Sequence, residues 1–169
     1  MSSTRTTVKT ATLEKERTGT VVPHLQRQLA NAFVLYANDK HYHWQTFGPL
    51  FRDLHLMFDD FAGQVLGTID ELAERIRILG HDIPITELRQ MQEAATVHST
   101  RPGQTMREML EEAHANSLAV IKEMHDAIDA ATGANDPGTV DTFTRFIQIH
   151  EKQEWFLRQA LQKRDGLTA

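Results

Sequence analysis

The sequence contains no cysteine among its 169 residues. This absence excludes disulfide bonds, thiolate metal sites and cysteine nucleophiles, so that His, Asp and Glu are the strong metal-binding side chains that remain. The chain also lacks a run of about 18 or more apolar residues and a basic, apolar leader after Met1, so we expect neither a membrane span nor secretion, and a cytoplasmic location. An excess of positive charge is missing too, because the formal net charge is -5. That balance argues against a globally basic nucleic-acid binder.

What the chain does contain is helical periodicity at a length that suits one domain. Residues 1–20 are rich in Ser and Thr and show little periodicity, so we expect a flexible N-terminal tail, followed by a folded domain over 21–164 and a short C-terminal tail over 165–169. Apolar residues recur at steps of three and four in four stretches. These stretches run from Pro23 to Trp44, from Phe51 to Gly80, from Met106 to Gly133 and from Thr139 to Lys163.

The segment between the second and third stretches is less regular. Pro84 and Pro102 interrupt it, and Ile85, Leu88 and Met91 have helical spacing, so we expect a loop with one short helix. Four long helices without an alternating strand pattern predict an all-α four-helix bundle with a short crossover helix. For the fourth helix, we expect the apolar residues on or near the inner face to be Phe143, Phe146, Ile147, Ile149, Trp155, Phe156 and Leu161.

The second predicted helix carries a polar stripe beside its apolar one. If His55 is placed at zero on a helical wheel of about 100° per residue, Asp59 lies near 40°, Asp70 near 60° and Glu74 near 100°. The apolar residues of the same helix cluster around 280°. Four potential metal ligands therefore share one face of the helix, away from the predicted core.

One straight helix cannot bring these four side chains to a single metal ion. At about 1.5 Å per residue, the pair His55 and Asp59 lies roughly 22 Å from the pair Asp70 and Glu74. A second, antiparallel copy of the helix across a two-fold axis would place one pair beside the other. Gly63 and Gly67 flank the midpoint on the ligand side, where they would allow close approach. The sequence alone thus predicts a metal site between subunits.

His43, at the end of the first predicted helix, is a candidate to join this site because the turn at Gly48 and Pro49 folds the chain back towards His55. Two imidazoles and three carboxylates form a donor set that suits iron or zinc rather than calcium. The alternative is that His55 is an interface histidine with satisfied hydrogen bonds and that the acidic residues form a solvated face. The concentration of four potential ligands in one arc, with glycines at its centre, favours the metal site.

Glu111 and His114 have the E-x-x-H spacing of another kind of metal site. A di-iron centre inside one bundle needs two such motifs on separate helices. Because only this one is found, we expect Glu111 and His114 to be a pair that faces solvent.

The stretch HWQTFGPLFRDLHLMFDDFAGQVLGTIDELAERI, with its spacing H-W-x(10)-H-x(3)-D-x(10)-D-x(3)-E, closely resembles the signature of the Dps family, the small ferritins of starved bacterial cells. EKQEWFLRQAL near the end resembles the fourth-helix signature of the same family. The resemblance covers Leu25 to Leu161 and implies a ferritin-like bundle. The residues that fall on the ferroxidase ligands of the family, and so are implied to be catalytic, are His43, His55, Asp59, Asp70 and Glu74.

The resemblance also implies a function. Family members form hollow dodecamers that oxidise Fe(II), typically preferring hydrogen peroxide to oxygen, store the Fe(III) mineral inside and thereby protect DNA. Trp44 matches an aromatic residue near the iron site of the family, with a packing role as the alternative. Asp136 and Asp141 resemble the acidic lining of its iron-entry pores, and the alternative for them is turn formation and helix capping.

Two histidines depart from the family pattern. His81 follows Gly80 where the family often has a second glycine, and a helical extension of the wheel would place it near 80°, inside the ligand stripe. His150 replaces a residue that is usually apolar. Our hypothesis is that one or both add an imidazole to the metal site or its surroundings, and the alternative is two ordinary surface or core histidines.

Two other functions remain open. One is a nucleoid-binding structural protein with secondary metal sequestration; the tail over 1–20 has only four basic residues besides Glu14 and Glu16, so we expect weak, salt-dependent DNA binding. A gel shift at low salt that disappears when residues 1–20 are deleted would favour that function. The other is sequestration of zinc without turnover, because the donor set also accepts zinc.

Overall fold

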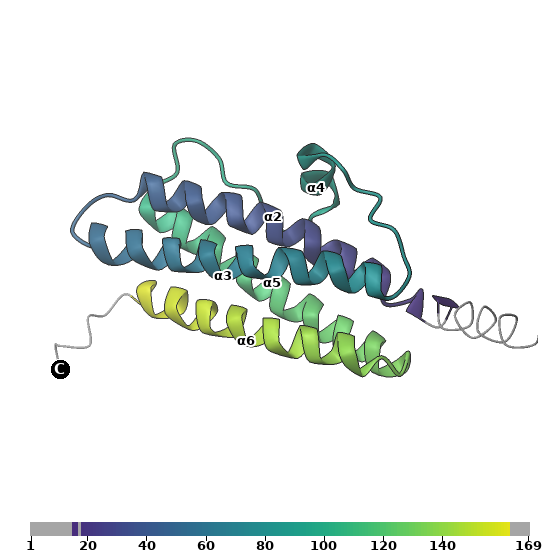
Figure 1. Ribbon diagram of the computed structural model, residues 1–169. Helices are drawn as coiled ribbons and strands as arrows, with labels where there is room; N and C mark the ends of the chain where they lie inside the picture. The colour runs from purple at the N-terminus through teal and green to yellow at the C-terminus, as the bar shows by residue number, and fades with distance from the viewer. Residues whose placement is uncertain (1–14, 17, 163–169) are drawn as a thin grey trace, which may run out of the picture.

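The structure, a computed structural model, describes residues 15, 16 and 18–162. Five helices have both ends within these residues, which contain no strand. The helices are α2 (Val22–Gln45), α3 (Phe51–Ile78), α4 (Leu88–Ala94), α5 (Met106–Gly133) and α6 (Pro137–Ala160). The all-α class, the four long helices and the short crossover helix are therefore confirmed (Figure 1).

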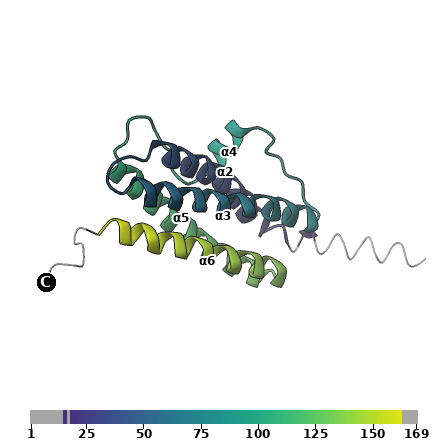
Figure 2. The ribbon, with the colours of Figure 1, turned by 60° about the vertical axis from the view of Figure 1, so that its left-hand side comes forward.

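The bundle consists of two helical hairpins. α2 packs mainly against α3, and α5 packs mainly against α6. The connection from α3 to α5 runs the length of the bundle and carries α4, which lies on the outside against α2 (Figures 1 and 2). Aromatic side chains such as Tyr42, Phe58, Phe143 and Phe146 are almost completely buried between the helices. No described helix combines the length and the apolar character that a membrane crossing requires.

Three buried asparagines fix the second part of this crossover. The side chain of Asn31 accepts from the backbone N–H of Thr96 at 2.8 Å. Asn38 donates to the carbonyl of His98 at 2.7 Å, and Asn116 both accepts from the N–H of His98 at 2.8 Å and donates to its carbonyl at 2.9 Å. Because a buried peptide group without a partner is costly, these amides replace the hydrogen bonds that a helix or strand would supply.

The inner face of α6 differs from the prediction towards its C-terminal end. Trp155 is 49% exposed and Phe156 is 37% exposed. His150, Gln153 and Leu157 are buried instead. Counted from His150 at about 100° per residue, Trp155 is turned by roughly 140° and Phe156 by roughly 120°. The prediction relied on the hydrophobicity of Trp155 and Phe156, whereas the burial of a residue depends on the side of the helix on which it lies.

The predicted tails lie mostly outside the described residues, so the domain boundaries at 21–164 stay a prediction. Residues 15, 16 and 18–20 of the predicted N-terminal tail are described. Thr18 is 1% exposed, and its carbonyl accepts from the N–H of Val21 at 3.0 Å. Thr18 is therefore buried next to the start of α2.

Candidate metal centre

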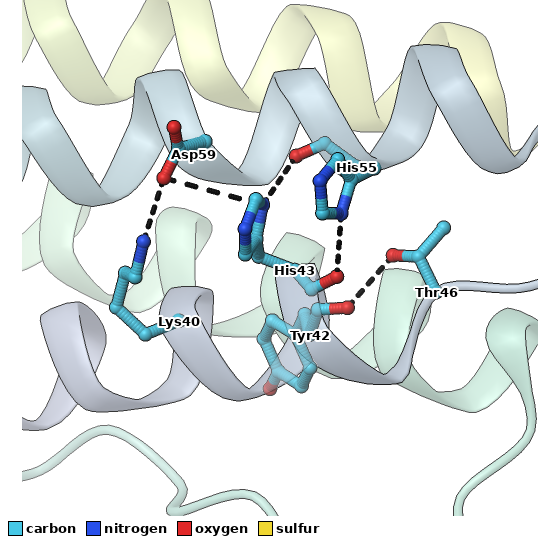
Figure 3. Close-up of polar contacts among 6 residues, drawn as sticks. All are labelled: Lys40, Tyr42, His43, Thr46, His55 and Asp59. Carbon is cyan, nitrogen blue, oxygen red and sulfur yellow. Dashed lines mark hydrogen bonds and ion pairs between the residues drawn. The ribbon is translucent and has the colours of Figure 1, made fainter.

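The end of α2 and the start of α3 hold two histidines in a reciprocal arrangement. His43 Nδ1 lies 2.7 Å from the backbone oxygen of His55, and His55 Nδ1 lies 2.9 Å from the backbone oxygen of His43 (Figure 3). The two rings are stacked, with centroids 3.7 Å apart. The turn over residues 46–50 is short enough to bring the last turn of α2 beside the first turns of α3.

This arrangement determines which ring nitrogen is available to a metal ion. A carbonyl oxygen only accepts hydrogen bonds, so each Nδ1 carries the proton. In the neutral imidazole the lone pair is then on Nε2. A backbone carbonyl bonded to the other ring nitrogen is the usual way in which proteins orient a metal-binding histidine. His43 and His55 thus fit a metal site without rearrangement of their tautomers.

Asp59 lies one turn beyond His55 on α3. Its Oδ1 is 4.0 Å from His43 Nδ1 and 2.6 Å from the ammonium of Lys40 (Figure 3). The hydrogen bond from Lys40 holds the pKa of the Asp59 carboxyl below its usual range. The carboxylate is therefore charged near neutral pH, and it is half exposed.

Asp70 and Glu74 lie farther along α3 and are both exposed. They form no hydrogen bond or ion pair with the part of the chain that the structure describes. Among residues 15, 16 and 18–162 of a single chain, no group of three or more His, Asp or Glu side chains is placed to hold a metal ion. The five predicted ligands thus lie in two separate groups on one chain, His43, His55 and Asp59 in one and Asp70 and Glu74 in the other.

The surface of α3 between these two parts is open. Gly63 and Gly67 are exposed, and a Cβ atom added at either would meet no atom within 4 Å in the described part of the chain. Leu66, between them, is an apolar side chain that is 51% exposed. The missing side chains at Gly63 and Gly67 leave room for another helix to approach this face closely.

Comparison with known proteins identifies the family of the chain. A family profile described as a ferritin-like domain matches residues 22–166. DNA protection during starvation protein 1 of Deinococcus radiodurans is 34% identical over 149 residues, which are 86% of this chain and 70% of that protein. The chain belongs to the Dps family.

Solved Dps structures have the same fold. Dps from Thermosynechococcus elongatus superposes with a TM-score of 0.86 at 43% identity, over 93% of this chain and 99% of that one. A Dps protein from Vibrio cholerae O1, described as a member of a broad superfamily of ferritin-like diiron-carboxylate proteins, gives a TM-score of 0.81 at 26% identity, over 88% of this chain and 92% of that one. The predicted ferritin-like bundle of the Dps family is confirmed.

His81 does not lie on the ligand stripe of this Dps chain. α3 ends at Ile78, and Gly80 has a positive φ of 80°, which turns the chain out of the helix. The N–H of His81 then donates to the carbonyl of Ile76 at 3.2 Å, as in other glycine-terminated helices. The helical extension that placed His81 near 80° was therefore wrong, although its Nε2 is buried without a hydrogen-bond partner among the described residues.

His150 is a core residue of α6. It is 3% exposed, and its Nδ1 is 3.0 Å from Oε1 of Gln153, which itself donates to Gln64 of α3 at 3.1 Å. Burial lowers the pKa of His150 to about 4, so the ring is neutral near neutral pH. Its partners are amides of the bundle interior and none of the five predicted ligands, so the core-histidine alternative describes it better.

The two predicted pore residues have different surroundings. Asp136 is the N-cap of α6, accepts from the N–H of Thr139 at 3.2 Å and is paired with Arg75 at 2.5 Å. It is 4% exposed, so the capping alternative is confirmed for this residue. Asp141 is exposed and 3.3 Å from Arg145. Only Asp141 presents its carboxylate on the surface of the chain, as a pore lining requires.

Glu111 and His114 do not form a pair. Glu111 is exposed and 3.7 Å from Arg107, one turn earlier on α5. His114 is partly buried and bonds to Glu154 of α6 at 2.9 Å. The expectation that both face solvent was wrong for His114, because its side chain turns towards α6.

Lys40 is the residue at this centre that the sequence interpretation missed. It precedes His43 by three residues, so the two side chains share a face of α2. This spacing is the one signal in the sequence, but the partner that gives Lys40 its role, Asp59, lies on another helix. Trp44, by contrast, was singled out, and it is 67% exposed beside His43. It does not fill the packing role that was its alternative.

Proposed function

We propose that this Dps-family chain is a ferroxidase that oxidises Fe(II) at sites shared between two subunits and stores the Fe(III) mineral inside a hollow dodecamer. The observation that carries the proposal is the reciprocal bonding of His43 and His55, which leaves Nε2 of each ring as the lone-pair donor, with the charged Asp59 one turn further along α3. Asp70 and Glu74 of the neighbouring subunit would complete the donor set. The description of the Vibrio cholerae relative as a diiron-carboxylate protein supports iron as the metal.

A two-fold register for α3 supports the shared site. Two antiparallel copies that cross between Gln64 and Val65 would place His55 opposite Glu74 and Asp59 opposite Asp70. The same register places Leu66 (51% exposed) opposite Gly63, a large side chain against a missing one. A register chosen for the ligands thus accommodates this exposed apolar side chain as well.

In this arrangement Fe(II) is the substrate. The imidazoles and carboxylates bind it, and their mixed nitrogen and oxygen donors accept both iron oxidation states and also zinc. With hydrogen peroxide as oxidant, each peroxide takes one electron from each of two Fe(II) ions and two protons, and leaves as water. The exposed indole of Trp44, next to His43 in sequence, would be oxidised by radicals formed at the site before they are released. Asp141 is the remaining candidate for an acidic entry path.

DNA protection is the physiological role that we propose, because removal of Fe(II) and peroxide suppresses radical formation. The names of the Deinococcus radiodurans and Brevibacillus brevis relatives refer to DNA protection during starvation. Direct DNA binding would depend on residues 1–20, which lie mostly outside the described part of the chain. The nucleoid-binding alternative therefore stays a prediction.

Oxidation of Fe(II), followed optically with peroxide and with oxygen in separate reactions, tests the proposal. The protein should accelerate oxidation well beyond the rate in buffer. The double variant Asp70→Asn, Glu74→Gln should lose most of this acceleration, by a factor of about 10 to 100 or more, since weaker changes around metal ligands already have effects of that size.

The matched control removes two exposed carboxylates of α5, with Asp126→Asn and Asp129→Asn. It should oxidise Fe(II) like the wild-type protein. A wild-type rate equal to that of buffer would rule out the ferroxidase and leave zinc sequestration as the better function.

A further inference from the structure

The ammonium of Lys40 is paired with one of the predicted metal ligands. It lies 2.6 Å from Oδ1 of Asp59, the oxygen that is also 4.0 Å from the ring of His43 (Figure 3). This oxygen therefore points into the space between α2 and the histidine pair. A cation bound through this oxygen would have to share or replace the contact with Lys40.

The burial of the pair suits a contact that can open and close. The side chain of Lys40 is 24% exposed, and that of Asp59 is 51% exposed. A lysine side chain is long and flexible, so its ammonium can move into water while its methylene groups stay against the helix. By contrast, the pair of Arg75 and Asp136 is largely enclosed, with side chains 19% and 5% exposed.

Electrostatics gives Lys40 two opposing effects on a divalent cation. The ammonium keeps Asp59 ionised and oriented before a cation arrives. Once a cation binds, the same ammonium is a like charge a few ångströms away, which weakens binding. The second effect is larger, because Asp59 would be ionised near neutral pH without help.

We propose that Lys40 is a displaceable counter-ion of the metal site, a positioning residue that closes on Asp59 when the site is empty and lowers its affinity for divalent cations. The inference rests on the proposed function, since it takes His43, His55 and Asp59 as ligands. Such a counter-ion suits a site that passes its cation on to a store. A site without it would retain the cation for longer.

The ordinary alternative is a surface ion pair that merely ties α2 to α3. Ion pairs of that kind contribute little to stability. Under this alternative, removal of Lys40 would leave the affinity for metal unchanged, or reduce it if Asp59 became less well oriented. The proposed counter-ion and the simple surface ion pair therefore predict different changes in the metal affinity of a variant without Lys40.

Zinc binding to the full-length assembled protein provides that measurement, because zinc needs no oxidant and reports affinity directly. Isothermal titration should show Lys40→Met binding zinc at least about tenfold more tightly than the wild type, a difference of about 1.4 kcal/mol. A chelator chase should show slower zinc release. Lys40→Arg, which keeps the charge, should resemble the wild type.

The matched control is Lys122→Met, which removes the lysine of an exposed pair with Asp126 on α5 and should leave zinc affinity unchanged. Unchanged or weaker zinc binding by Lys40→Met would overturn the inference. The proposed site itself is tested by Asp59→Asn. If zinc binding survives in Asp59→Asn, the proposed ligands are wrong; if it is lost there while Lys40→Met equals the wild type, only the role of Lys40 fails.

Discussion

Replacing Gly63 with leucine is expected to disrupt the subunit pair and, with it, Fe(II) oxidation. Within one chain the substitution is harmless, because a Cβ atom at Gly63 meets nothing within 4 Å in the described residues, and a helical Gly to Leu change favours the helix by up to about 1 kcal/mol. In the proposed register, however, Gly63 faces Leu66 of the neighbour, and two leucines would occupy the space of one. Sedimentation velocity should show smaller species, and the oxidation rate should fall at least about tenfold.

The control is Ala115→Leu, which introduces the same side chain at an exposed position of α5. It should leave both the assembly and the oxidation rate unchanged. If Gly63→Leu assembled and oxidised Fe(II) like the wild type, α3 would not be the contact between subunits. The expected loss therefore distinguishes a property of the assembly from a property of the folded chain.

Replacing Arg75 with methionine is expected to destabilise the bundle by about 3–5 kcal/mol, since it leaves the buried carboxylate of Asp136 without its cation. Arg75 bonds to Asp136 at 2.5 Å and to the hydroxyl of Thr139 at 2.9 Å. It passes over Gly138, where a Cβ atom would lie 2.7 Å from the guanidinium. This contact joins the end of α3 to the start of α6. Urea unfolding at a fixed subunit concentration measures the change.

The same pair predicts a dependence on pH. Burial alone would raise the pKa of Asp136, but the hydrogen bonds from Thr139 and the charge of Arg75 outweigh it and hold the pKa below the usual value. The stabilisation is therefore present above the ordinary carboxyl pKa of about 4 and is lost as the pH falls below it. In Arg75→Met the folded-state pKa of Asp136 should rise, so lowering the pH should cost this variant less stability than it costs the wild type.

Arg77→Met is the control for this second prediction. Arg77 is exposed and pairs with the exposed Asp82, so we expect a change below about 1 kcal/mol. Equal effects of the two substitutions would mean that the contact between Arg75 and Asp136 contributes no more than a surface ion pair.

The features that the sequence predicted well depend on the helical period. α3 is the clearest case, because apolar residues from Leu54 to Ile76 and the ligand stripe from His55 to Glu74 follow the same geometry on opposite sides. The wheel also required a partner for α3, since the two pairs of ligands are too far apart on one helix. Periodicity of this kind is local, and so it can be read from one stretch of sequence.

The failures occurred where tertiary contacts or a break in the helix decide the outcome. The wheel was extended to His81 through Gly80, whose positive φ ends α3. The pore interpretation gave Asp136 an exposed role, whereas Arg75, 61 residues away in sequence, holds its carboxylate in the interior. Lys40 was missed because its meaning comes from Asp59 on another helix. Contacts between distant residues leave no periodic signal.

The central claim is that each metal site takes His43, His55 and Asp59 from one chain and Asp70 and Glu74 from another, and co-assembly of two inactive variants tests it most directly. His55→Ala lacks one part of the site, and the double variant Asp70→Asn, Glu74→Gln lacks the other. When the two are co-expressed in equal amounts, half of the subunit pairs should be mixed, and each mixed pair should contain one intact site of two. We predict Fe(II) oxidation at roughly a quarter of the wild-type rate per subunit. A mixture no more active than either variant alone would contradict the shared site.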